Sequence, residues 1–324
     1  MLARHQIEVS IGLALLVLGI LLAVRAPNFF QAGNLLDVLL ATLPVLIVAV
    51  GATFVILTGE IDISVGSVFA VCSVAAGIMA LAGMPIPLVG LMTVLVGAAL
   101  GAVNGALVAW LHLPSIVVTL ATMVAWRDGL RWVTQGAWVQ HLPPAFQWLG
   151  LSQGSYPIAS VVVVTLVLAA GAWALLMLPA GRAVYATGSN AEAARLAGIA
   201  TRRVRFWTFT IAGACTGLAA LMNAVRFSQI PANTGVGLEM QVVAAVVVGG
   251  TAITGGRGTI VGTVLGVALL GMMGPALTFL GASAFWERAL QGAIILVAVG
   301  ADAIRARRRP VTRRAGGQPE TARA

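Results

Sequence analysis

The 324-residue sequence contains no lysine, so all 19 of its basic residues are arginine. This absence excludes every chemistry that needs a lysine amine, including the phosphate-binding lysine of a P-loop and the catalytic lysine of a kinase. Charged residues of both signs make up only 9% of the chain, whereas about 25% is usual for a soluble domain. The sequence therefore lacks the charged surface that a soluble globular protein needs.

Cysteine and histidine are also scarce. Cys72 and Cys215 lie inside apolar segments, where a lone cysteine behaves as a small hydrophobic residue. His5, His112 and His141 are scattered along the chain. We therefore expect no disulfide framework, metal site, catalytic residue or cofactor.

Apolar residues dominate what is present. They make up 60% of the chain, together with 38 glycines, and apolar runs of 18 to 25 residues recur from end to end. Each run is long enough to cross about 30 Å of hydrocarbon. The sequence thus predicts an all-α polytopic membrane protein with ten segments, at 7–24, 38–58, 65–82, 88–111, 115–133, 158–178, 206–225, 238–250, 260–280 and 287–303. The eighth is short and stops in a glycine-rich stretch, which is typical of a broken or re-entrant helix.

The arginines predict the orientation. If the chain crosses the membrane ten times, fourteen of the arginines lie on the same side as the N-terminus. The other five do not: Arg25, Arg127, Arg131, Arg226 and Arg288. Because cytoplasmic loops are rich in arginine, both termini are expected in the cytoplasm. The net charge of +9 then reflects orientation and no nucleic-acid partner. We expect a membrane domain over 1–303 and a basic, disordered cytoplasmic tail over 304–324 that lies against anionic lipid.

Two stretches of the sequence echo each other at an offset of 196 residues. Thr58-Gly59 and Val65-Gly66-Ser67-Val68 match Thr254-Gly255 and Val261-Gly262-Thr263-Val264. Duplicated units are common in transporters, but glycine and valine are frequent enough here for a chance match. Both explanations remain open.

The segment at about 180–205 carries the clearest local signal. Asn190 is a good N-cap, Glu192 suits the first turn of a helix, and Gly198 is placed to end it. The sequence predicts a two-turn helix on the cytoplasmic side, either a docking element for a partner or a simple connector. Its alanines would let it fit a groove.

Several charged and aromatic residues are harder to interpret. Glu60 and Asp62 follow the second segment and suit either helix capping or ligand contact, and Arg127 and Asp128 can neutralise each other. Glu239 opens the eighth segment, and no series of acids crosses the bilayer. The external loop 134–157 holds four aromatics that suit an interfacial belt or a protein-docking surface: Trp138, Phe146, Trp148 and Tyr156. Glycines spaced by four, at 97, 101 and 105 and at 258, 262 and 266, are expected to pack helices.

Four stretches in order make the chain resemble the permease subunits of bacterial ABC sugar importers of the ribose, xylose and rhamnose type, a group that also includes autoinducer-2 importers. The first runs from Thr58 to Ser67, and the second combines Gly101-Ala102-Val103-Asn104-Gly105 with Pro114 and Ile116 to Thr122. The third runs from Ala186 to Ile199, and the fourth is Gly249-Gly250-Thr251 with Gly255-Gly256-Arg257-Gly258. The resemblance covers nearly all of the chain up to residue 303.

The resemblance implies a pair of permease subunits in the bacterial inner membrane, a cytoplasmic ATPase subunit and a periplasmic sugar-binding protein. The missing lysine agrees with ATP hydrolysis by a partner and with no enzymatic activity in this chain. The resemblance also implies that the 190–198 helix couples to the ATPase, through Gly188, Asn190, Glu192, Ala193, Ala194, Arg195 and Gly198. Polar residues in or near the motifs and spans are candidates for contact with the small-molecule sugar: Asp62, Asn104, Thr119, Thr122 and Asn223.

The sequence departs from this group at four places. Relatives commonly have glycine at the positions of Glu60 and Asp128, serine at Ala252, and an asparagine pair near Gly274-Pro275. These differences favour a less polar solute, such as a deoxysugar or autoinducer 2. The alternatives are a secondary carrier, which needs acids near mid-membrane and no ATPase, and an intramembrane enzyme, which needs a catalytic constellation that the sequence lacks.

Overall fold

The computed structural model describes residues 2–283, 285–293, 296 and 300, with the side chains described from residue 8 onward. The described chain is mainly helical, and its one β-bridge joins Val139 and Ile230. The order of elements is α1(Leu2–Arg25), η1(Pro27–Phe30), α2(Ala32–Leu57), α3(Val65–Leu81), α4(Ile86–Ala109), α5(Ser115–Thr134), η2(Gln147–Gly150), α6(Tyr156–Met177), α7(Pro179–Ser189), α8(Ala191–Leu196), α9(Thr201–Ala224), α10(Leu238–Val248) and α11(Ile260–Phe279).

Six of these helices are long and apolar enough to cross a membrane, namely α1, α2, α4, α6, α9 and α11. The other expected segments that the structure describes in full are also helical, but α3 and α10 have only 17 and 11 residues, and α5 carries three charged residues. Residues 285–293 are helical, whereas the rest of the expected tenth segment is largely outside the described residues, as is the tail 304–324. The structure thus agrees with a multi-pass membrane protein.

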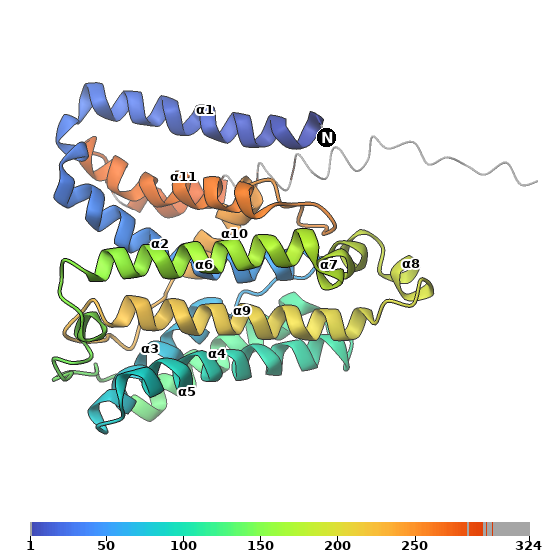
Figure 1. Ribbon diagram of the computed structural model, residues 1–324, viewed down its shortest axis with the longest axis horizontal. Helices are drawn as coiled ribbons and strands as arrows, with labels where there is room; N and C mark the ends of the chain where they lie inside the picture. Colours follow the sequence, from blue (N-terminus) through green and yellow to red (C-terminus); the bar gives the residue numbers. More distant parts are fainter. Residues whose placement is uncertain (1, 284, 294–295, 297–299, 301–324) are drawn as a thin grey trace, which may run out of the picture.

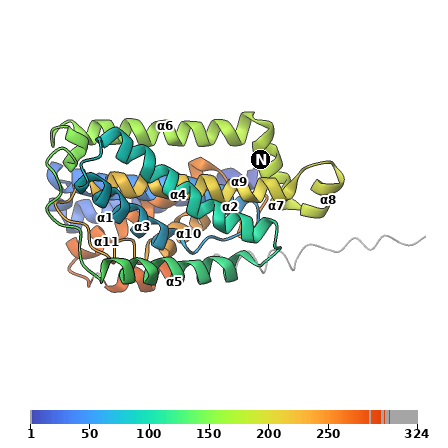
Figure 2. The same ribbon diagram turned by 90° about the horizontal axis from the view of Figure 1, so that it is seen from below.

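Helix α9 lies at the centre of the bundle, where it packs against α4, α2 and α3 (Figure 1). The α4–α9 contact depends on small residues, as predicted for the stripe at 97, 101 and 105. A Cβ atom at Gly101 would overlap the Phe209 carbonyl oxygen, and one at Gly213 would overlap that of Gly97. Such close backbone approach is how helices gain van der Waals contact in lipid. Figure 2 shows α6 along one side of the bundle and α5 along the other.

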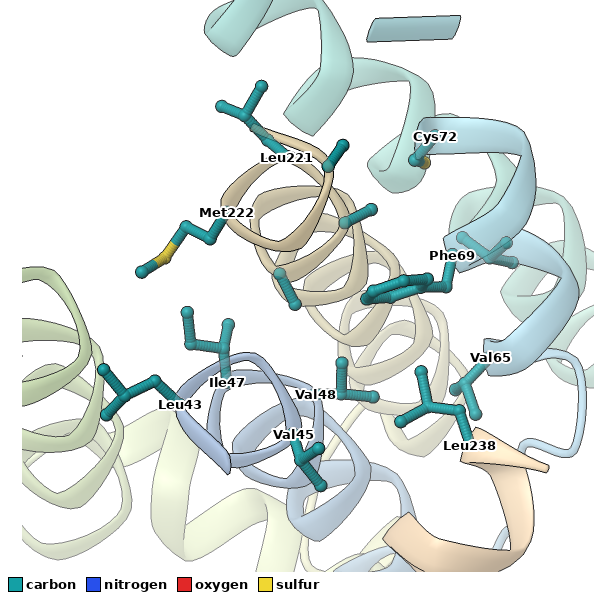
Figure 3. Packing of buried hydrophobic residues seen from close by; sticks show 14 of the residues in the cluster. Leu43, Val45, Ile47, Val48, Val65, Phe69, Cys72, Leu221, Met222 and Leu238 are labelled. Carbon is teal, nitrogen blue, oxygen red and sulfur yellow. The ribbon is translucent and has the colours of Figure 1, made fainter. Parts of the chain in front are cut away.

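The main core lies where α2, α3 and α9 meet (Figure 3). Val48 of α2 points towards Phe69 of α3, and Ile47 of α2 points towards Met222 of α9, with Leu221 of α9 in the same cluster. Cys72 is fully buried within α3, and Cys215 is half-buried within α9. The fold therefore holds α3 firmly even though this helix is short.

Two short helices form one end of the molecule. α7 follows α6 directly, and α8 protrudes beyond the ends of α6 and α9, at the same end as the N-terminus (Figure 1). Helix α7 was not predicted from the sequence, although Pro179 at its first position is a standard signal for a helix start. Residues 180–205 are thus largely helical.

The loop 134–157, which was expected to be external, is packed more tightly than expected. Phe146 and Tyr156 are buried in the main core, and Trp148 is partly buried against it, whereas Trp138 is exposed. The expectation that all four aromatics form an interfacial belt or a docking surface is therefore wrong for Phe146 and Tyr156. The Val139–Ile230 bridge ties this loop to the segment before α10.

Candidate functional site

Helix α8 has the caps that its sequence predicts. The Asn190 side chain accepts a hydrogen bond from the Ala193 amide at 3.0 Å, and Glu192 lies in the first turn. Gly198 follows the C-cap with φ of +84°, a conformation that glycine adopts without strain. Because a six-residue helix is too short to be stable alone, these caps and its attachment to α7 and α9 hold it in place.

The surface of α8 is suited to contact with a partner. Leu196 is 78% exposed and Ala193 is exposed, whereas Ala194 is buried against the protein. Glu192 and Arg195 form an exposed ion pair of 2.6 Å, and the Arg195 guanidinium lowers the pKa of Glu192. Leu196 thus lies uncovered beside small residues on a helix that protrudes from the bundle.

Gly188, in the last turn of α7 and three residues before α8, contacts two distant parts of the chain. A Cβ atom there would overlap the Leu57 carbonyl oxygen and lie 2.7 Å from the Gly256 nitrogen. The Gly256 amide donates a hydrogen bond to the same Leu57 oxygen at 2.9 Å. The end of α7 thus touches both the end of α2 and the glycine-rich segment before α11.

The two echoed stretches also meet at this point. Gly59 and Gly255, which are equivalent at the offset of 196, have φ of +81° and +82°. A Cβ atom at Gly255 would lie 2.7 Å from the Gly59 nitrogen and 3.0 Å from the Gly188 α-carbon. Several unrelated glycines of the chain, such as Gly83 and Gly198, have nearly the same φ, so this match does not decide between duplication and chance.

The segment 58–64 between α2 and α3, which we call the first connection, carries buried polar groups. Asp62 accepts hydrogen bonds from the amide and the hydroxyl of Ser64, at 2.8 and 2.6 Å. The Asn104 amide nitrogen of α4 donates to the same hydroxyl at 2.8 Å. Asp62 and Asn104 are therefore brought together, with Ser64 between them.

Helix α5 lies against the same connection. The Ile61 amide donates to the Ser115 hydroxyl at 3.2 Å, and the Thr119 hydroxyl bonds mainly to the Ser115 carbonyl at 2.8 Å, 3.4 Å from the Ile61 carbonyl. Thr122 lies one turn further along α5, where its hydroxyl bonds to the Val118 carbonyl. Thr119 thus belongs to the group around Asp62, and Thr122 lies at its edge.

Asn223 lies elsewhere. It is in the last turn of α9, 18 residues beyond Arg205, or about 27 Å along the helix. Arg205, near the start of α9, forms an ion pair of 2.9 Å with Glu60 of the first connection. The structure therefore does not bring Asn223 to the group around Asp62.

Arg127 and Glu239 come close to each other at the first turn of α3, a meeting that the sequence did not predict. Asp128 pairs with Arg131 at 3.1 Å, on an exposed face of α5, so the expected pairing of Arg127 with Asp128 is wrong. Arg127 points inward instead. A Cβ atom at Gly66 would overlap a carboxylate oxygen of Glu239 and lie 3.2 Å from an Arg127 nitrogen.

Helices α3 and α10, whose first turns lie beside these groups, are both short. Their 17 and 11 residues correspond to about 25 and 17 Å, less than the roughly 30 Å of hydrocarbon. Figure 3 shows Val65 and Leu238, which open α3 and α10, side by side. Interrupted helices whose ends meet within the membrane are where transporters place their solute sites.

Comparison with known proteins places the chain in a family. The family model described as branched-chain amino acid transport system / permease component matches residues 34–299. The chain is 35% identical over 301 residues to the autoinducer 2 import system permease protein LsrC of Photorhabdus luminescens, covering 91% of this chain and 89% of the relative. The protein of the same name from Salmonella typhi is 37% identical over 298 residues, with 90% and 84% covered. No solved structure gives a significant match.

Both the motifs and the helices agree with this result. The match includes the first connection, the capped helix α8 and the glycine-rich segment before α11. Proteins of this kind are transport components in the inner membrane, not catalysts. The chain therefore belongs to the branched-chain amino acid transport system permease family, as a permease of the ABC sugar-importer type.

Proposed function

We propose that this chain forms the membrane pathway of an ATP-driven importer for a sugar-like solute, and that the solute is autoinducer 2. The transport function rests on the family. The choice of autoinducer 2 rests on the relatives, which are autoinducer 2 import permeases that are 34 to 40% identical to this chain. The polar lining that the chain offers is short, because it is confined to the first turn of α3 and its surroundings. Such a site suits a small solute better than a long saccharide.

The coupling mechanism rests on the close backbone contact of Gly188 with Leu57 and Gly256. A cytoplasmic ATPase subunit would bind α8 through the surface formed by Ala193 and Leu196. Movement of α8 would then pass through Gly188 to the Leu57 carbonyl and to Gly255, since these backbones touch without intervening side chains. The first connection begins directly after Leu57, so ATP-driven movement reaches the Asp62 group with no covalent chemistry in this chain.

The remaining partners follow from the same proposal. A second permease subunit, identical or related, completes the pathway, and a periplasmic binding protein delivers the solute on the side opposite α8. Both termini then lie in the cytoplasm, with ten membrane segments. Asp62, Asn104 and Thr119 line the pathway at its cytoplasmic half, with Thr122 and Asn223 further along it.

Uptake of labelled autoinducer 2 by cells that lack their own importer tests the proposal. The cells would express the chain with its ATPase, its binding protein and its second permease, and each partner would be omitted in turn. We expect uptake only with the complete set, and uptake of ribose well below that of autoinducer 2. Uptake that continues without the ATPase and follows an ion gradient would show a secondary carrier, and a preference for ribose would overturn the choice of solute.

Two leucine variants test the role of α8. Leu196→Asn removes the exposed apolar side chain of α8, and Leu151→Asn makes the same change at an exposed leucine in the external loop. We expect Leu196→Asn to reduce uptake about tenfold or more at unchanged membrane abundance, and Leu151→Asn to leave coupling to the ATPase intact. Equal uptake by the two variants would contradict an ATPase contact at α8.

A further inference from the structure

Some buried polar atoms near the first turn of α3 have no hydrogen-bond partner within the described chain. They are Nη1 and Nη2 of Arg127, Oε2 of Glu239 and Oδ1 of Asn104. A buried polar group without a partner costs about 1–3 kcal/mol, and more when it is charged. Unpaired groups of this kind are rare in native proteins and call for a functional explanation.

These atoms gather around a short stretch of backbone. Gly66 has the Glu239 carboxylate, the Gly235 carbonyl and the Arg127 guanidinium against its α-carbon, so no side chain fits there. Two residues earlier, the Ser64 hydroxyl accepts the hydrogen bond from Asn104. Helices α4, α5 and α10 thus each direct one polar side chain towards the start of α3.

The chemistry of the group is complementary to hydroxyl groups. A guanidinium has only donors, whereas a carboxylate and an amide oxygen accept, and each solute hydroxyl donates one hydrogen bond and accepts others. Arg127 and Glu239 carry one charge of each sign, and Asp62, which binds Ser64 beside Asn104, adds no positive charge. The group therefore suits an uncharged polyhydroxylated solute and gives no net attraction to a phosphorylated one.

We propose that Arg127 and Glu239, with the amide oxygen of Asn104, form the solute-binding group of the pathway, which takes uncharged polyhydroxylated solutes. The proposal rests on the proposed transport function and adds the residues that recognise the solute. These atoms are sealed from solvent here, so the solute reaches them only when the segment before α10 moves away from α3. Gly235 and Gly237, both at positive φ, lie in that segment next to the Glu239 side chain.

The alternative is that Arg127 and Glu239 act only as an electrostatic latch between α5 and α10. A latch affects the uptake of every solute equally, whereas a binding group affects each solute according to its hydroxyls. The exposed Arg131–Asp128 pair on the same helix supplies a matched control, since Arg131→Gln removes an arginine of α5 that lies away from the group.

The test measures concentration-dependent uptake of autoinducer 2, ribose and rhamnose by cells with the complete importer, for Arg127→Gln, Glu239→Gln and Arg131→Gln. We expect Arg127→Gln and Glu239→Gln to raise the KM for the parent's best solute about tenfold and to change the ratio of uptake between solutes at least fivefold. Arg131→Gln is expected to keep the parent's ratio. Membrane abundance and melting temperature of each variant identify any loss that is due to misfolding.

Three results would overturn the inference. One is an equal loss for all solutes at an unchanged ratio, and another is parental uptake by Glu239→Gln. The third is rescue of uptake at the parental ratio by the charge exchange Arg127→Glu with Glu239→Arg, which would show a latch. If the parent chain itself takes up none of the three solutes, the proposed transport function fails, whereas failure of this inference requires a parent that transports.

Discussion

The first connection, residues 58–64, and the second connection, residues 249–259 between α10 and α11, can be compared position by position. Both turn at a glycine after a threonine, Gly59 and Gly255, with nearly equal φ. At the offset of 196, however, Glu60 and Asp62 of the first connection correspond to Gly256 and Gly258 of the second. One connection carries two acids where the other carries two glycines.

This difference assigns the two connections different tasks. Gly256 contacts the backbone of Ser189, so a side chain there would push away the end of α7. Glu60 instead forms an ion pair with Arg205 of α9. Asp62 accepts a hydrogen bond from Ser64, whose hydroxyl is bound in turn by Asn104 of α4. The same turn is thus used once for close backbone packing against α7 and once for presenting charge inside the bundle.

Alanine substitution of the two turn glycines gives the largest expected contrast. Gly59→Ala and Gly255→Ala share the cost of a positive φ, roughly 1–2 kcal/mol. A Cβ atom at position 59 meets the Thr254 oxygen at an ordinary 3.4 Å, whereas one at 255 meets backbone atoms at 2.7–3.0 Å. We expect Gly255→Ala to destabilise the protein by a further 2 kcal/mol or so, as overpacking does. Thermal melts in detergent measure this, and equal melting temperatures would contradict the contact.

A smaller effect is expected from Asp62. Asp62→Ala leaves the buried Ser64 amide and hydroxyl without their acceptor and should cost about 1–3 kcal/mol. Asp62→Asn keeps an acceptor oxygen and should lose less than half as much. The melting temperature and uptake of both variants test this. Gly258→Ala, at the equivalent position of the second connection, is expected to lower the melting temperature for a different reason, because its Cβ atom would overlap the Thr251 side chain. Equal losses for alanine and asparagine would mean that the acceptor is unimportant.

The ion pair between Glu60 and Arg205 should give the smallest change in stability. The side chains are 13% and 27% exposed, so either Glu60→Gln or Arg205→Gln should cost about 1 kcal/mol after allowance for solvent screening. A double-mutant cycle on melting temperature measures the coupling. Arg195→Gln, which breaks a fully exposed pair, is the control and should not change the melting temperature. Additive losses at Glu60 and Arg205 would show that the two charges do not interact.

Features encoded by neighbouring residues could be predicted from the sequence. The caps of α8 depend on Asn190 and Gly198, whose effects extend only over a turn, and both occur as predicted. The glycine stripe of α4 and the short α10 were also predicted, since spacing and length are properties of a single segment. Helix α7 was missed because a hydropathy-based segment ended before it.

Features that need tertiary contact could not be predicted in the same way. Arg127 and Glu239 lie 112 residues apart, and only the packing of α5 and α10 around α3 brings both to Gly66. Sequence proximity favoured Asp128 as the partner of Arg127, but the two side chains leave α5 in different directions. Phe146 and Tyr156 were misassigned for a related reason, since the folding of a long loop back onto a core leaves no local signal.

The placement of the two cysteines has a practical consequence. Cys72 is buried and Cys215 is half-buried within the apolar helix α9, so neither native thiol is fully exposed to polar thiol reagents. A cysteine introduced at the exposed Ala193 would therefore be labelled faster than either native thiol. Paired spin labels at that position would report how far apart the protruding helices of the two proposed permease subunits lie, and whether that distance changes when the proposed ATPase binds nucleotide.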